Sequence, residues 1–171
     1  MKQLFHDVLA TTKSIERDLR ALGNIPQEGK FPRSSQVVPY ALVRGTRGYL
    51  EKLVHQINGT YENGWFDATA VLTRRLLETL IIEVFEKHKI ESRLQNSSGD
   101  FFYLSDLISK CISETAWNLS RNTKRALPRL KDVGDKSAHS RRYNALKQDI
   151  DVLLPDLRVT IQELIYLSGL K

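Results

Sequence analysis

The sequence predicts an all-α fold, an antiparallel helical bundle with an N-terminal helical arm. Apolar residues recur at three-, four- and seven-residue steps along most of the chain, and no stretch of strand length alternates apolar with polar residues. Hydrophobic residues make up 41% and charged residues 27% of the 171 positions, which is typical of a folded globular protein and excludes a disordered chain. A chain of this length is expected to form one main domain.

The N-terminal region is expected to be separate from the bundle. The spacing of apolar residues predicts a helix over residues 2–22, ended by Gly23 and Asn24; its stripe is formed by Leu4, Val8, Ile15, Leu19 and Leu22. Residues 23–39 contain three prolines and two glycines, and we interpret them as an extended connection. We therefore divide the chain into an arm and connection, residues 1–39, and a bundle, residues 40–171. Because the stripe of the arm needs a partner, we expect a homodimer.

The bundle is expected to contain five helices. They are predicted over residues 46–61, 65–89, 101–114, 118–133 and 144–168. Asp100 is the expected N-cap of the third of these helices, and Pro128 is expected to bend or split the fourth. Pro155 lies opposite the apolar stripe of the last helix, where a bend leaves the core face intact.

The helix over residues 65–89 is apolar around more than half of its circumference, which predicts a central position in the bundle. Arg74 falls inside this apolar arc, and Glu78 follows one turn later, where the two side chains can pair. Since a buried charge must be paired or used, the pair is either a structural ion pair or part of a functional site.

Positive charge is concentrated in one segment. The formal net charge is +6, and residues 121–147 alone contain nine Lys or Arg residues against Asp132 and Asp135. Such a segment is typical of proteins that bind nucleic acid or phosphate. The alternative is a solvated face of a basic protein.

The sequence Gly134–Arg142 is expected to form a basic loop at the start of the last helix. Free N–H groups at a helix N-terminus favour phosphate, and the side chains expected to bind it are Lys136, Arg141 and Arg142, with Arg125 and Arg129 at the rim. His139 is the nearby side chain that exchanges a proton near neutral pH, so it is the candidate catalytic residue together with Lys131. The alternative is that His139 and Asp135 only cap and brace the loop.

Other chemistry has no sequence support. There is no glycine-rich phosphate loop, no pair of histidines one turn apart and no pair of cysteines, so we expect neither a metal nor a cofactor. Cys111 lies on an apolar stripe and is expected to be a buried thiol in a cytoplasmic protein. The aromatic group Tyr61, Trp65 and Phe66 is expected to pack in the core, although such rings also stack on bases. No segment has the length of apolar sequence that a membrane span requires.

Three segments together carry a family resemblance. Tyr61–Ala68, Leu72–Glu78 and Gly134–His139 contain, in order, an aromatic helix junction, an Arg-x-x-x-Glu helix and a Gly-Asp-x-x-Ala-His motif. In this order they resemble a widespread bacterial helical family of uncharacterised function, which occurs alone and in restriction-type defence proteins and is similar to the HEPN superfamily. The resemblance covers about residues 40–170.

The resemblance implies a HEPN-like bundle that is usually dimeric and either cleaves RNA without a metal or binds without catalysis. In catalytic members four to six residues intervene between an Arg and the His, whereas this chain has Asp132, Val133 and Gly134 at the corresponding positions. Lys131 or Arg129 would have to replace that Arg. We therefore expect a module that binds RNA or nucleic-acid phosphate in phage defence or stress, with a defence-system protein as a further partner. The alternatives are a non-catalytic protein-interaction or dimerisation module and a metal-independent ribonuclease or toxin.

Overall fold

The computed structural model of the 171-residue chain describes Thr11, Lys13 and residues 37–171. The predicted arm, residues 2–22, and most of the connection lie outside the described residues apart from these two positions. The described residues from 37 onward belong to a unit that begins at residue 32. They form an all-α bundle, which confirms the predicted fold class at this level.

The regular elements of this unit are six α-helices and two short 3₁₀ helices, with one isolated β-bridge between Gln95 and Phe101. In chain order they are η1 (Tyr40–Leu42), α2 (Gly48–Glu62), α3 (Phe66–Lys87), η2 (Glu91–Leu94), α4 (Leu104–Ser113), α5 (Arg121–His139), α6 (Lys147–Asp151) and α7 (Leu154–Leu167). None of the described helices combines the length and the apolar character needed to cross a membrane.

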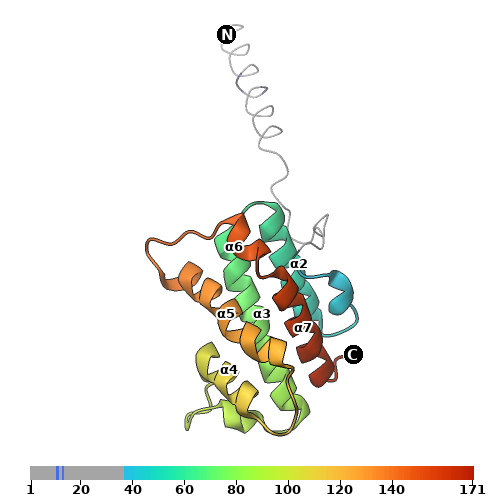
Figure 1. Cartoon of the computed structure of the whole chain (residues 1–171). Helices are drawn as coiled ribbons and strands as arrows, with labels where there is room; N and C mark the ends of the chain where they lie inside the picture. The colour runs from blue at the N-terminus through green and yellow to red at the C-terminus, as the bar shows by residue number, and fades with distance from the viewer. Residues whose placement is uncertain (1–10, 12, 14–36) are drawn as a thin grey trace, which may run out of the picture. The chain divides into compact units, whose positions relative to one another are not determined.

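Helix α3 occupies the centre of the unit, as its sequence predicts. It packs against α2, α5 and α7, and against α4 toward its C-terminal end (Figure 1). Leu76, Leu77, Leu80 and Ile81 have no exposed surface. A helix that contacts neighbours on several sides has to be apolar on several sides, which explains its broad apolar arc.

Two predicted helix boundaries are wrong. Helix α4 begins at Leu104 after Tyr103, and Asp100 does not cap it. The predicted helix 144–168 is two helices, because the chain breaks between α6 and α7 and Pro155 occupies the first turn of α7. Proline is well accommodated there, since the first turn of a helix has no intrahelical partner for its N–H groups.

Helix α5 is longer than its sequence predicts. It begins after Ser120, whose side-chain oxygen accepts a hydrogen bond from the Thr123 N–H at 3.2 Å, and it runs through Pro128 without ending. It also continues through Gly134 and Asp135 to His139, so the predicted loop over residues 134–142 is wrong. Residues 134–139, two thirds of that segment, are helix.

Gly134 is a packing residue rather than a turn residue. It is buried, and a Cβ atom placed on it would lie 2.7 Å from Arg74 Cβ and 3.0 Å from the Ala70 carbonyl oxygen. Real Cβ atoms do not approach other carbons this closely, so glycine at 134 allows the backbone of α5 to approach α3.

The packed unit begins before residue 40. Val37 and Val38 are fully buried, and both of their backbone N–H groups donate to Asn58 Oδ1, at 3.0 and 3.1 Å. Asn58 in α2 completes the arrangement by donating to the Val38 carbonyl at 2.8 Å. The buried amide side chain of Asn58 thus fixes residues 37 and 38 to the bundle. These last residues of the predicted connection therefore belong to the core.

Candidate nucleic-acid interface

The Arg-x-x-x-Glu segment of α3 and the Gly-Asp-x-x-Ala-His segment of α5 contact each other. Arg74 donates from Nε to Asp135 Oδ1 at 2.7 Å, and a second guanidinium nitrogen lies 3.5 Å from Glu78 Oε2. Lys131 Nζ lies 2.5 Å from the other oxygen of Asp135. The predicted pairing of Arg74 with Glu78 is therefore present, but Asp135 is the closer partner of the guanidinium.

This network lies at the edge of the core rather than inside it. The side chain of Arg74 is 23% exposed and that of Asp135 is 30% exposed. Burial alone would raise the pKa of Asp135, but the hydrogen bonds from Lys131 and Arg74 outweigh it and hold that pKa below its usual value. Asp135 is thus a carboxylate between two cations, and its single negative charge is shared by Arg74 and Lys131.

Apart from Lys124, which is half-buried, the remaining cations of the basic segment divide into paired and unpaired ones. Arg129 forms an ion pair with Asp156 at 2.9 Å, and Lys147 forms one with Asp151 at 2.6 Å. Five others are exposed and have no acidic partner within residues 37–171: Arg121, Arg125, Lys136, Arg141 and Arg142. We refer to these five residues as the unpaired cations.

Three of the unpaired cations, Arg121, Arg125 and Lys136, lie on one side of α5, and Arg141 and Arg142 belong to the turn that follows it. Arg121, Arg125, Arg129, Lys136 and His139 recur at steps of three, four and seven residues, so they share the exposed face of the helix. Arg121 and Lys136 are separated by 15 residues, or about 22 Å along the axis. Asp132 interrupts this face with one exposed carboxylate. Arg121 does not belong to the predicted binding set. Its four-residue spacing from Arg125 is the sequence signal that places it on the same helix face.

His139 lies in a different setting from the predicted one. It occupies the last turn of α5 and is exposed, four residues beyond Asp135. The cations at this end lie at a helix C-terminus, where the helix dipole favours positive side chains, and not at a helix N-terminus. The following helix, α6, has only five residues, and Asp149 already accepts a hydrogen bond from the Leu146 N–H at 2.9 Å. The candidate binding surface is therefore the exposed face of α5 together with the turn that follows it, and not a helix N-terminus.

The segment between α5 and α6 is fixed to the start of α3. The Ala145 N–H donates to Asp67 Oδ1 at 2.9 Å, and the Tyr143 hydroxyl donates to Asp149 Oδ2 at 3.0 Å. Burial and the hydrogen bond to Asp149 raise the pKa of Tyr143 to about 12, so its hydroxyl remains a donor at neutral pH. Arg141 and Arg142 are held close to this anchored stretch.

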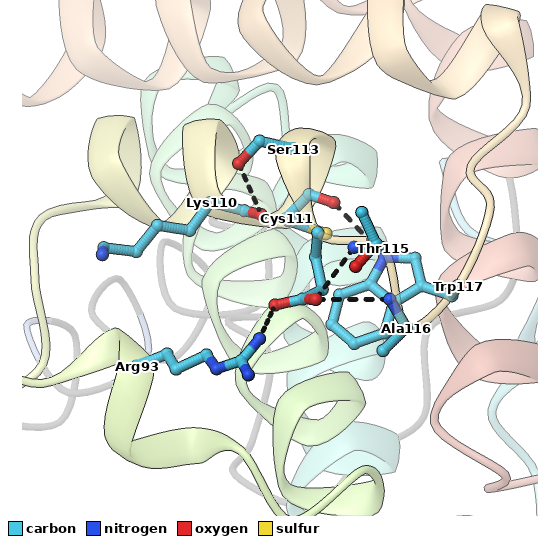
Figure 2. A network of polar contacts seen from close by, with 8 residues as sticks. Arg93, Lys110, Cys111, Ser113, Thr115, Ala116 and Trp117 are labelled. Atoms are coloured by element: carbon cyan, nitrogen blue, oxygen red, sulfur yellow. Dashed lines mark hydrogen bonds and ion pairs between the residues drawn. The ribbon is translucent and has the colours of Figure 1, made fainter.

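A second polar cluster lies between η2 and the end of α4 (Figure 2). Arg93 donates to Glu114 at 2.7 Å, and the other Glu114 oxygen accepts the N–H groups of Thr115 and Ala116, at 2.8 and 3.2 Å. An open hollow of about 470 Å³ lies beside these residues, with Lys110 at its edge. Because Glu114 is occupied by its own turn and by Arg93, we interpret this cluster as the closure of the α4–α5 connection.

Cys111 lies beneath this cluster. It is fully buried, as predicted, and its carbonyl oxygen accepts a hydrogen bond from Trp117 Nε1 at 3.3 Å. Burial raises the pKa of the thiol to about 12. Reactive cysteines have lowered pKa values, so Cys111 is a core residue.

No group of three or more His, Cys, Asp or Glu side chains that could hold a metal ion occurs in the part of the chain that the structure describes. Comparison with known proteins finds no family model, characterised relative or solved structure to which the chain is significantly similar. Proposals about function therefore rest on the geometry and charge of the described residues.

Proposed function

We propose that the protein binds RNA through phosphate contacts made by the five unpaired cations of α5 and the segment that follows it. The observation that carries this proposal is that some cations contact carboxylates and others do not. Arg74, Lys131 and Arg129 already contact carboxylates, whereas Arg121, Arg125, Lys136, Arg141 and Arg142 are exposed without such a partner in residues 37–171.

Unpaired cations favour a polyanionic partner for two reasons. Those on α5 repel one another along the face of the helix, and a phosphate backbone placed there relieves that repulsion. Their binding also releases the counterions condensed on the nucleic acid, which is the main source of affinity in such complexes. A cation that already contacts a carboxylate has to give up that contact first, so we leave Arg129 and Lys131 out of the binding set.

We further propose a HEPN-like antiparallel arrangement of the helices. In support, the Arg74–Asp135 contact joins the Arg-x-x-x-Glu helix to the Gly-Asp-x-x-Ala-His motif across 61 residues of sequence. Gly134 supports it as well, because its close approach to Ala70 and Arg74 gives the motif glycine a packing role. A role in phage defence or stress, with a defence-system partner protein, follows from the resemblance and is proposed with it.

The experiment is a salt titration of RNA binding. Fluorescence anisotropy with a labelled single-stranded oligonucleotide measures the association constant of the parent protein and of Arg141→Ala/Arg142→Ala between low and moderate salt. We expect the double variant to bind more weakly and its log–log salt slope to fall by about 1.4, or 0.7 for each lost phosphate contact. A parent that binds no RNA at low salt, or a double variant with unchanged slope, would refute the proposal.

The same preparation separates binding from cleavage. Incubation of the labelled RNA with the protein in EDTA reveals metal-independent hydrolysis, and His139→Ala removes the candidate proton-transfer group. We propose binding without cleavage, because the Lys131 ammonium, the candidate charge-stabilising group, is held by Asp135. Cleavage in EDTA that His139→Ala abolishes would instead establish the ribonuclease alternative.

Self-association is proposed as a second property. Val159 is 49% exposed and Tyr166 is 75% exposed, and they lie two turns apart on the outer face of α7. Exposed apolar side chains that share one side of a helix can form part of a protein contact surface. Multi-angle light scattering at micromolar concentration is expected to give a dimer, and a mass near 19.6 kDa would contradict it.

A further inference from the structure

We infer that Trp65 is a base-stacking residue, so that the RNA recognised by this surface is single-stranded. The inference rests on the proposed RNA-binding function and extends it from the phosphates to the bases. It starts from the aromatic group at the α2–α3 junction, which the sequence predicts to be buried.

The structure separates Trp65 from its aromatic neighbours. Tyr61 is 6% exposed and packs edge-on against Phe66, with ring centroids 5.7 Å apart. Trp65 is 54% exposed and takes no part in that contact. The prediction of core packing is therefore confirmed for Tyr61 and Phe66 and wrong for Trp65.

The backbone of Trp65 is held firmly although its side chain is exposed. Its N–H donates to the Thr60 carbonyl at 2.9 Å, and its carbonyl accepts the Thr69 N–H at 2.9 Å and the Thr69 hydroxyl at 3.0 Å. Trp65 thus bridges the last turn of α2 and the first turn of α3. Because the backbone that carries the indole is fixed, stacking of another ring restricts only the two side-chain torsions of Trp65.

Trp65 and the C-terminal cations lie at the same end of the bundle. The Ala145 N–H donates to Asp67, two residues after Trp65, and Lys147 Nζ lies 5.3 Å from the centre of the Tyr61 ring. Figure 1 shows the same arrangement, with the chain running from α5 to α6 beside the α2–α3 junction. Arg142 is three residues before Ala145, so at most about 11 Å of backbone separates them.

An exposed aromatic ring at the end of the bundle that also carries unpaired cations is a combination suited to single-stranded nucleic acid. The cations bind the phosphates, and the ring stacks on a base that is not paired with another strand. A duplex keeps its bases stacked inside the helix, so it can use the cations but not the indole. The chemistry of this surface therefore favours an RNA strand with unpaired bases.

Two measurements test the inference. In Trp117→Phe, Trp65 is the one remaining tryptophan of the two in the chain. We expect oligouridylate to quench its fluorescence, whereas an abasic oligomer of equal length and an RNA duplex bind without this quenching. The second measurement is the RNA affinity of variants that keep Trp117. It remains available if Trp117→Phe does not fold.

We expect Trp65→Ala to weaken oligouridylate binding roughly tenfold and to leave abasic binding unchanged, with Trp65→Phe in between. The matched control is Tyr103→Ala, which removes an aromatic ring that is 82% exposed at the start of α4. This control should bind as the parent does. Equal weakening by Trp65→Ala and Tyr103→Ala would overturn the assignment.

The outcomes separate the two proposals. If the parent binds no RNA, both the function and the stacking role are refuted. If the parent binds RNA with salt dependence but Trp65→Ala binds oligouridylate equally well, only the stacking role is refuted. Loss of self-association in Trp65→Ala with unchanged RNA affinity would also refute it and would identify the indole as a protein contact.

Discussion

Replacing Gly134 by alanine tests whether the α3–α5 contact determines the fold around the motif. In an exposed helix interior this change stabilises a protein by about 1 kcal/mol, because alanine has the higher helix propensity. At position 134 the new Cβ would lie 2.7 Å from Arg74 Cβ and 3.3 Å from Arg74 Cδ. Arg74 Cβ is bonded directly to the backbone of α3, so it cannot move unless the helix moves.

Relief of this clash requires α5 to move away from α3, and overpacking of this kind costs about 1–3 kcal/mol. After subtraction of the propensity gain, we expect Gly134→Ala to destabilise the protein by up to about 2 kcal/mol. Gly59→Ala is the matched control, because Gly59 lies within α2 and a Cβ there meets nothing within 4 Å. This control should be neutral or stabilising by up to about 1 kcal/mol.

Urea denaturation followed by circular dichroism measures both free energies of unfolding. The difference between the two variants cancels the propensity term and isolates the contact with Arg74 and Ala70. Equal or greater stabilisation by Gly134→Ala than by Gly59→Ala would refute the packing role of the glycine.

Three further predictions concern the core and the ion-pair network. In a double-mutant cycle, the coupling free energy between Arg74→Met and Asp135→Asn should be on the order of 1 kcal/mol. It should exceed the coupling between Arg74→Met and Glu78→Gln, because Asp135 is the closer partner of Arg74. Equal coupling free energies in the two cycles would contradict this ranking. The lowered pKa of Asp135 stabilises the protein above the ordinary value of 3.8, and this contribution is lost as pH falls through the lower folded-state pKa. Acid titration of stability should therefore show the parent's advantage over Asp135→Asn shrinking below about pH 3.8, and a constant difference would count against it. Cys111, with its pKa raised to about 12, should resist a thiol-specific disulfide reagent at pH 8 until urea unfolds the chain, and rapid labelling of the native protein would show that it is accessible.

The sequence predicts the all-α fold and the central helix well because both depend on long apolar periodicity. The broad apolar arc of α3 follows from contacts on several sides, and single residues do not alter it. Helix ends are harder, since they depend on one or two residues. The sequence favours a turn at Gly134 because glycine usually ends helices, and only the tertiary contact with Ala70 shows why it lies inside one.

The sequence predicts most residues of the candidate site but not which of them form ion pairs. The basic segment is evident from charge alone, and Lys131 and Asp135 have the four-residue spacing of a helical ion pair. That spacing is meaningful only if the helix continues, so the loop interpretation concealed it. The Arg129–Asp156 and Arg74–Asp135 pairs join distant parts of the sequence, and no local pattern identifies them. The exposure of Trp65 likewise depends on how the α2–α3 junction packs.

The central claim is that unpaired cations, and not net charge, bind RNA. Two triple variants test it, each with three positive charges removed: Arg125→Gln/Arg141→Gln/Arg142→Gln from the unpaired cations, and Arg93→Gln/Arg129→Gln/Lys147→Gln from cations with acidic partners. The measurement is the log–log salt slope of single-stranded RNA binding. We expect the slope to fall by about 2 in the first variant and to change little in the second. Equal reductions in the two variants would show that net charge alone determines binding and would refute a specific role of the unpaired cations.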